Sequence, residues 1–347
     1  MRKKLCHSLS DVIQSDLHHL KAATKRRRKH AFRPGTARNH LQQFKLYLAF
    51  CTYFQLQDVD PTSDTICWYI EFLTRSFKSP KSIKNYISGV RLLHKLIHVD
   101  CPNLYSFEVH LHLRSLSLTM PHFPKQRLPI TLDILYELCA LCDSLQGTGK
   151  VLKCAFIFAF FGYLRQSNLV PPTASQFDPS RHTCRGDVFL QPPGLVILLK
   201  WTKTIQHRTK CHLVPLPQIL DSPLCPVSAY TEMVTAIPTT HANQPLFLLP
   251  VPKPGTKPHP LTAPQLRQCL QELLSCIPHI QPELYTLHSF RAGGATTSFH
   301  CGVPVTHIKQ HGSWASESFW GYISSPNVSN SIVASTFARV ASQYLPH

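Results

Sequence analysis

Apolar side chains recur at three- and four-residue steps through the first part of the chain, which is the spacing of one face of a helix. Further helices are expected to open at Pro61, at Ser79 with Pro80 in the first helical position, and at Ser106. The predicted fold here is a small helical bundle with basic outer faces. The first apolar series begins near Thr36 and consists of Ala37, Leu41, Phe44, Leu48 and Cys51. The basic side chains left for solvent or phosphate include Lys81, Lys84, Arg91 and Lys95.

The second part of the chain combines apolar helices with one hairpin. Thr131 is the expected N-cap of a helix, and residues 150–163 are so uniformly apolar that they predict a central, buried helix. Residues 195–201 and 212–216 are rich in Val, Ile and Leu and predict an antiparallel hairpin with a polar turn between them. The predicted fold class is mainly α with a small antiparallel β-sheet. More helices are expected over residues 226–236, 262–277 and 288–300.

Two domains are expected from a length of 347 residues. The first covers residues 34–120, and a linker with several prolines at 121–129 separates it from the second, 130–347. Residues 1–33 are predicted to be a basic, disordered tail. A run of basic residues in it is typical of a nuclear import signal, of a DNA-contacting arm, or of a merely solvated tail. This run consists of Lys25, Arg26, Arg27, Arg28 and Lys29.

The net charge of +18, from 36 Lys and Arg against 18 Asp and Glu, favours a polyanionic partner. Each phosphate that a basic side chain neutralises releases counterions, so nucleic acid is the leading interpretation. A generally basic protein, or one that binds an anionic membrane surface, has the same charge. No apolar run is long enough to span a bilayer, and the N-terminus lacks the apolar core of a signal peptide.

The 13 cysteines are scattered, and only Cys139 and Cys142 form a close pair. No second pair completes a zinc site, so burial in a helix is a better interpretation of this pair than metal binding. The 13 glycines are few for a Gly-rich nucleotide-binding enzyme. We therefore expect neither a metal nor a cofactor, and a reducing intracellular compartment fits the free thiols.

Two basic residues stand where apolar elements end. Arg165 directly follows the apolar helix, and a half-buried guanidinium requires either an anion or several acceptors, for which helix carbonyls serve equally well. Lys203 lies where the first strand meets the turn. Such a lysine is usually only exposed, but a hairpin that carries it into a cleft lets it protonate a leaving oxygen.

Two further clusters follow near the C-terminus. His288 and Arg291 are three residues apart on a predicted helix, so both can donate to one phosphate. The small residues at 292–295 allow that helix to pack closely, although His-x-x-Arg is common by chance among 21 histidines. His311 and Trp314 precede Tyr322, a grouping that is more often an aromatic core or interface.

In chain order, the four clusters resemble the tyrosine recombinase (phage integrase) family, and the likeness extends over residues 36–341. Within that family the sequence is similar to the recombinases of DIRS-type and Ngaro-type retroelements. The narrower likeness rests on the segments Gln126-Arg127-Leu128-Pro129-Ile130-Thr131, Trp201-Thr202-Lys203-Thr204-Ile205-Gln206 and Gly312-Ser313-Trp314-Ala315-Ser316.

The resemblance implies a helical core-binding domain and an α+β catalytic domain of the DNA breaking-rejoining type. It implies a site-specific recombinase or integrase that acts on double-stranded DNA in the nucleus, as a homo-tetramer, for mobile-element integration. Tyr322 would attack phosphorus to give a 3′-phosphotyrosyl enzyme, and Lys203 would protonate the 5′-oxygen. Arg165 and Arg291 would hold the non-bridging oxygens, and His288 would add a donor or base. The ester keeps the bond energy, so this chemistry implies neither ATP nor metal.

The sequence departs from the family pattern at two points. Asn168 stands where an acidic residue is usual, which bears on the support of Arg165. Either His311 or Trp314 can be the last donor, and the Gly-x-Trp-x-Ser form favours Trp314. Two other functions remain open: a catalytically silent DNA-binding protein derived from a recombinase, and a type IB topoisomerase-like enzyme. Tyr344, a second C-terminal tyrosine, is interpreted as packing or tail because no similar cluster precedes it.

Overall fold

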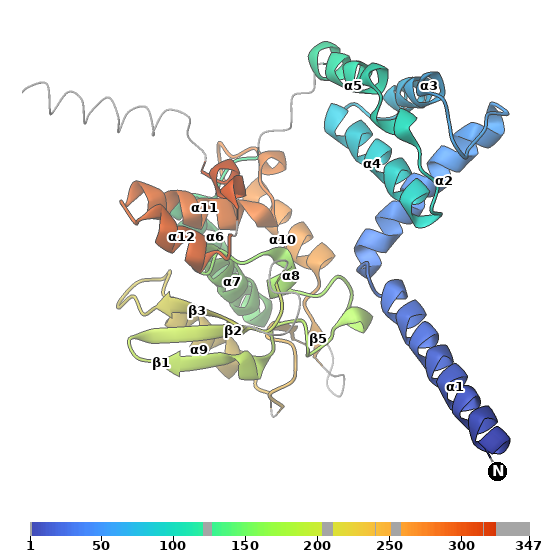
Figure 1. The fold of residues 1–347 in the computed structure, drawn as a ribbon. Helices are drawn as coiled ribbons and strands as arrows, with labels where there is room; N and C mark the ends of the chain where they lie inside the picture. Colours follow the sequence, from blue (N-terminus) through green and yellow to red (C-terminus); the bar gives the residue numbers. More distant parts are fainter. Residues whose placement is uncertain are drawn as a thin grey trace, which may run out of the picture. The chain divides into compact units, whose positions relative to one another are not determined.

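The computed structural model describes residues 2–120, 127–202, 211–239, 241–250, 258–314 and 316–323. The chain divides into two compact units, Met1–Pro124 and Lys125–His347. Helices make up most of both units, and within the described residues all strands belong to the second (Figure 1). The expected class, mainly α with a small antiparallel sheet, is confirmed.

Residues 1–33 are expected from their charge to be a disordered tail, whereas the structure describes the helix α1 (Arg2–Lys29) there. This segment contains neither glycine nor proline and is rich in Leu, Lys and Arg, which are strong helix formers. Helix propensity thus outweighs the basic charge from which a disordered tail was expected. Lys25, Arg26, Arg27 and Arg28 are exposed on this helix.

The rest of the first unit is a bundle in which helices open at Ser79 and Ser106 as expected, although the Ser79 side chain makes no capping hydrogen bond. The helix expected to open at Pro61 has Thr62 as its N-cap. The Thr62 hydroxyl accepts a hydrogen bond from the Thr65 amide at 3.1 Å. The Ser106 hydroxyl accepts one from the Val109 amide at 3.3 Å. The elements are α2 (Pro34–Tyr53), α3 (Ser63–Thr74), α4 (Pro80–Leu96), the 3-10 turn η1 (Pro102–Tyr105) and α5 (Phe107–Thr119).

The buried face of α2 matches the expected one in part, because Cys51 is buried and Phe44 is half-buried as expected. Leu41 and Leu48 are 49% and 38% exposed, whereas Tyr47 and Phe50 are buried. The rings of Tyr47 and Phe50 each pack against Tyr69 of α3, with centroids 5.2 and 5.1 Å apart. These aromatic pairs bury more surface than the leucines would, so they determine which side of α2 faces the core.

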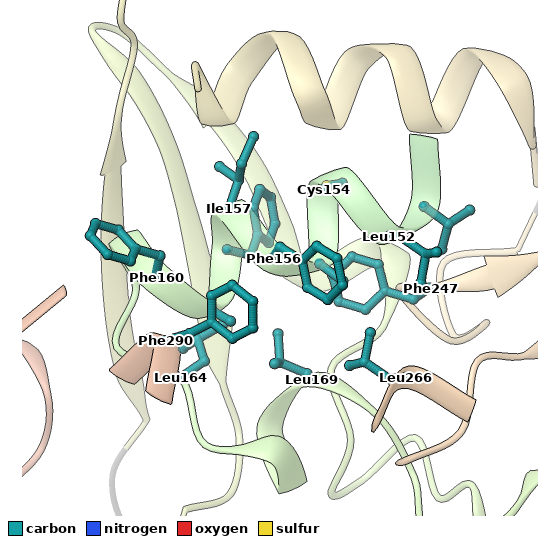
Figure 2. Close-up of a cluster of buried hydrophobic side chains, with 14 of the residues drawn as sticks. Leu152, Cys154, Phe156, Ile157, Phe160, Leu164, Leu169, Phe247, Leu266 and Phe290 are labelled. Carbon is teal, nitrogen blue, oxygen red and sulfur yellow. The ribbon is translucent and has the colours of Figure 1, made fainter. Parts of the chain in front are cut away.

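The second unit is built around α7 (Gln146–Phe161), whose residues from Val151 to Phe160 are all buried. It contacts α6 (Leu132–Asp143), whose N-cap Thr131 accepts from the Ile134 amide at 3.3 Å. Figure 2 shows the aromatic centre of this core, where the rings of Phe156 and Phe290 stack with centroids 5.0 Å apart. The expectation of a central, buried helix is confirmed.

The expected hairpin is confirmed as β2 (Gly194–Leu199) paired antiparallel with β3 (His212–Pro217). A further strand that the pattern did not predict, β1 (Val188–Gln191), extends this sheet in the order β1-β2-β3. Only one of its side chains is buried, so its sequence lacks an alternating apolar signal. The helix α9 (Pro226–Ala236) packs against β2 and β3.

The remaining elements complete the second unit, and α9, α10 and α11 confirm the helices expected in its later part. Residues 250–260 are a proline-rich segment of the sequence, and 251–257 lie outside the described residues. The other elements are α8 (Gln166–Leu169), η2 (Ala174–Gln176), η3 (Arg185–Asp187), β4 (Leu248–Leu249), β5 (His259–Pro260), α10 (Ala263–Ser275), η4 (Pro282–Leu284), α11 (Leu287–His300), α12 (Val305–His311) and η5 (Glu317–Gly321).

Cys139 and Cys142 are buried in α6, as expected. Among the described residues, no group of three His, Cys, Asp or Glu side chains is placed to hold a metal ion. No helix in the described part of the chain is long and apolar enough to cross a membrane.

Candidate active site

Arg165 is placed by a tight turn at the end of α7. Gly162 ends the helix and Tyr163 adopts a left-handed backbone with φ of 46°, which directs the chain into the single turn α8. Arg165 is the N-cap residue of α8 and is half-buried. Its guanidinium makes no hydrogen bond to the described residues, and burial lowers its pKa, against the opposing effect of Tyr322. A cation in this position has unused donors for an anion.

Arg291 lies in α11 and is only 2% exposed. One of its terminal nitrogens donates to the Tyr163 carbonyl, and the other donates to the Gly312 carbonyl at 2.7 Å. Its Nε has no partner among the described residues. Burial and, to a lesser extent, Arg165 lower the pKa of Arg291. A guanidinium nevertheless stays protonated at neutral pH.

Two glycines let α11 approach its neighbours closely enough to place Arg291. A Cβ atom on Gly293 would lie 1.9 Å from the Ile130 carbonyl oxygen, and one on Gly294 would lie 2.2 Å from the Phe160 carbonyl oxygen. The close packing expected from the small residues after Arg291 is therefore confirmed.

His288 lies one turn before Arg291 on α11 and is exposed. Its ring centroid is 4.9 Å from that of Tyr322. Partial desolvation, then Arg291 and Arg165, lower the pKa of His288, so its neutral form is favoured at neutral pH. A neutral imidazole next to a tyrosine can accept the phenolic proton.

Tyr322 is held at both backbone groups just after η5. Its amide donates to the Phe319 carbonyl at 2.8 Å, and its carbonyl accepts from the Thr296 hydroxyl at 3.1 Å. Its ring is half-buried and lies 5.1 Å from the ring of Trp314. The guanidinium carbon of Arg291 is 5.4 Å from the centroid of the Tyr322 ring. Arg291 and Tyr322, from distant parts of the sequence, are thus brought together.

His311 and Trp314 differ in what their donors do. His311 donates from Nε2 to the Phe161 carbonyl at 2.9 Å, and burial lowers its pKa. Trp314 is 7% exposed, and its indole Nε1 is buried without a partner among the described residues. The His311 donor at Nε2 is therefore occupied by backbone, whereas the Trp314 donor has no acceptor in the described part of the chain.

A narrow pocket joins several of these residues. Its lining includes Arg165, Arg291 and His311, with Thr202 and His212 from the sheet side, and contains no carboxylate among the described residues. His212 was not singled out from the sequence, and it donates to the His311 carbonyl at 2.9 Å. The sequence around a strand residue does not indicate a hydrogen bond to a backbone carbonyl so far along the chain.

Lys203, the predicted acid, lies outside the described residues, as does Tyr344. The neighbouring Lys200 is not an alternative, because its Nζ forms an ion pair with Asp187 at 2.6 Å. Thr202, directly before Lys203, is buried.

The candidate DNA-binding residues of the first unit have different environments. Lys81 and Lys84 are exposed, and Lys84 donates to the Ser117 hydroxyl at 2.9 Å. Arg91 was expected to be left for solvent or phosphate, but it is half-buried and donates twice to the Leu104 carbonyl, at 3.2 and 2.8 Å. Its guanidinium also lies 4.5 Å from the Tyr105 ring centroid, so Arg91 joins α4 to η1. The side chain of Lys29 is outside the described part.

No protein-family model and no curated protein matches the sequence. Solved structures do match over most of the chain. The Tn1549 transposon integrase in complex with transposon right end DNA has a TM-score of 0.56 and 12% identity, covering 92% of this chain and 98% of that one. The XerH site-specific recombinase bound to a difH substrate has a TM-score of 0.54 and 14% identity, covering 86% and 78%.

The lambda integrase dimer bound to a core site gives a TM-score of 0.51 at 13% identity, covering 91% of this chain and 80% of that one. At such low sequence identity, structural similarity shows the fold and does not show which reaction the chain catalyses. Together with the architecture described above, it shows that this chain has the fold of the tyrosine recombinases and transposon integrases.

Proposed function

We propose that this chain is a site-specific tyrosine recombinase that breaks and rejoins double-stranded DNA through Tyr322. The observation that carries the proposal is the pair Arg165 and Arg291. Both line one pocket whose described residues include no carboxylate, and the Tyr322 ring centroid lies 5.4 Å from the guanidinium carbon of Arg291. Two close guanidinium groups with donors to spare fit a phosphodiester, whose non-bridging oxygens share one negative charge.

In this proposal the phosphate supplies the acceptors that the site lacks. Arg165 and Arg291 hold the non-bridging oxygens, and the buried Nε1–H of Trp314 donates to one of them. The phenolic oxygen of Tyr322 attacks phosphorus, and its proton passes to the neutral imidazole of His288. The bond from phosphorus to the 5′-oxygen breaks, leaving a 3′-phosphotyrosyl ester. Lys203 is proposed to give the 5′-oxygen its proton.

We further propose that the reaction serves a mobile element of the DIRS or Ngaro type, on the basis of the motifs that resemble those recombinases. Recombination between two duplexes requires four strand cleavages, which one tyrosine per protomer supplies in a tetramer. The net charge of +18 favours DNA over a neutral partner. The exposed basic run of α1, which includes Arg26 and Arg28, is proposed as a nuclear import signal or DNA-contacting arm.

The test is formation of a covalent protein–DNA adduct on suicide substrates that carry the ends of the chain's own element. Wild-type protein should form the adduct and Tyr322→Phe should not, because phenylalanine has no nucleophilic oxygen. Tyr344→Phe is the matched control and should keep the adduct. Adduct formation by Tyr322→Phe would exclude the proposal. Binding of DNA without any adduct would identify a silent DNA-binding protein, and relaxation of supercoiled DNA without sequence preference would indicate a topoisomerase.

A further inference from the structure

Asn168 makes three hydrogen bonds at the centre of the second unit and is 4% exposed. Its side-chain Nδ2 donates to the Trp201 carbonyl at 3.0 Å. Its backbone amide donates to the Arg165 carbonyl at 2.8 Å, and its own carbonyl accepts from the Thr183 hydroxyl at 2.7 Å. One residue thereby connects the turn that carries Arg165 to the end of β2 and to the segment before β1.

The α8 turn needs such a connection because it is too short to be stable without tertiary contacts. It spans only four residues, Gln166–Leu169, and a helix of one turn has almost no intrinsic stability. Arg165 at its start has no side-chain hydrogen bond to the described residues that would fix its direction. The position of its guanidinium therefore depends on how the backbone of α8 is anchored.

The Asn168 side chain must be an amide to make this anchor. The Trp201 oxygen is an acceptor, so its partner has to be a donor, and a carboxylate at the same place would set two acceptors against each other. The asparagine is hence matched to its surroundings, and its presence is no sign of a decayed site.

We propose that Asn168 is a positioning residue that holds the α8 turn against the end of β2 and so aligns Arg165 with the scissile phosphate. The effect on catalysis rests on the proposed function. The hydrogen bond from Asn168 that anchors α8, however, is present in the free protein. Asn168→Asp is the direct test, because it keeps the shape and removes the donor. Asn168→Ala, which removes the donor without adding a charge, replaces it if the Asp variant does not fold.

The readout compares two DNA substrates in single-turnover adduct formation. One carries the natural phosphodiester, and the other carries a neutral methylphosphonate at the scissile position. A methylphosphonate has no negative charge for a guanidinium to stabilise. The rate loss caused by Arg165→Ala should therefore be much smaller on the methylphosphonate than on the phosphodiester. Asn168→Asp should follow the same pattern, with a loss on the order of 10- to 100-fold on the phosphodiester, the range typical of outer partners of a site residue.

Asn103→Asp is the matched control. The Asn103 amide also donates to a backbone carbonyl, that of Pro61 at 3.1 Å, but it lies in the first unit. Asn103→Asp should change the thermal stability of the protein, but it should leave the ratio of the adduct rates on the two substrates as in wild type. An Asn168→Asp variant that keeps wild-type rates, or that loses rate equally on both substrates, would overturn the proposal.

Hydrogen exchange in the free protein separates this inference from the proposed function. The amides of Asn168 and Val170 bond within the α8 turn, to Arg165 and Gln166 respectively, and should exchange faster in Asn168→Asp. Unchanged exchange of these amides would overturn the anchor even if the enzyme is active. If wild-type protein forms no adduct with either substrate, the proposed function fails, while the exchange result still decides whether Asn168 anchors α8.

Discussion

The guanidinium carbon of Arg291 lies 3.7 Å from the centroid of the Trp314 ring. The same ring is 5.1 Å from the ring of Tyr322, so Trp314 packs against both the proposed phosphate ligand and the proposed nucleophile. The face of an indole attracts a cation, which offsets part of the cost of burying Arg291. Its edge has an N–H that finds no acceptor in the described part of the chain. Trp314 can thus support the site in two separable ways.

Trp314→Phe should remove the N–H donor and keep an aromatic face against Arg291. A hydrogen bond to a charged group contributes about 1.5–3 kcal/mol, so adduct formation should slow by roughly 10- to 100-fold in single turnover. Trp320→Phe is the control, because that indole is exposed and already donates to Glu317 at 2.9 Å. Equal rates for Trp314→Phe and wild type would show that the indole N–H is not the last donor.

Arg165→Ala should cost ~3 kcal/mol or more of transition-state stabilisation, as for a lost oxyanion donor. Binding of DNA should weaken far less, because many phosphate contacts share the affinity. Adduct kinetics and a gel-shift titration on the same substrate measure the two effects. Arg267→Ala is the control, because Arg267 is an exposed arginine that donates to the Gln166 side chain. This variant also loses one positive charge, but it should form the adduct at the wild-type rate. Loss of binding in proportion to rate would contradict this role of Arg165.

Substitution of Arg291 should affect the stability of the fold as well as catalysis, unlike substitution of Arg165. Its side chain bonds the carbonyls of Tyr163 and Gly312, so truncation to alanine leaves two buried acceptors unsatisfied. Thermal unfolding should therefore separate the two variants, with Arg291→Ala the less stable and Arg165→Ala close to wild type. Equal melting temperatures would show that the Arg291 contacts contribute little to the fold.

Gly294→Ala should destabilise the second unit by about 1–3 kcal/mol, the usual cost of overpacking. The added Cβ would lie 2.2 Å from a backbone oxygen, that of Phe160, which cannot rotate away. Gly35→Ala is the matched control, because a Cβ there meets nothing within 4 Å and alanine favours the helix. Denaturant unfolding of both variants tests the difference. A neutral effect of Gly294→Ala would mean that α11 can move away from α7.

The sequence was sufficient for those features that depend on local pattern. The uniform apolarity around Phe156 predicted α7, and the dense run of Val, Ile and Leu near Ile197 predicted the central strand of the sheet. The cap at Thr131 also follows from residue types alone. The candidate site could be predicted because its residues have chemical types that recur in a recognisable order.

Contacts between residues far apart in the sequence could not be predicted. The bond from Asn168 to Trp201 spans 33 positions, and the bond from His311 to Phe161 spans 150. Arg91 looked like a free cation on an outer helix face, yet the Leu104 carbonyl lies within its reach. In each case the partner is a backbone carbonyl, which every residue has and which leaves no mark in the sequence.

His311 makes the stability of the fold depend on pH. Burial, followed by His212 and Arg291, lowers its pKa below the ordinary value of 6.5, and the bond to the Phe161 carbonyl opposes that effect only in part. The folded protein therefore favours the neutral ring. Stability from this group is complete above the unfolded pKa and is lost as pH falls through the lower, folded pKa.

His311→Gln should reduce this loss, because a glutamine amide can donate to the Phe161 carbonyl and does not titrate. The free energy of unfolding, measured by denaturant titration between pH about 7.5 and 5, should fall less steeply with acidification in the variant than in wild type. Some dependence should remain, since burial also lowers the pKa of His182. His307→Gln, on an exposed position of the same helix, controls for the substitution itself. Parallel curves for wild type and His311→Gln would show that His311 does not control acid stability.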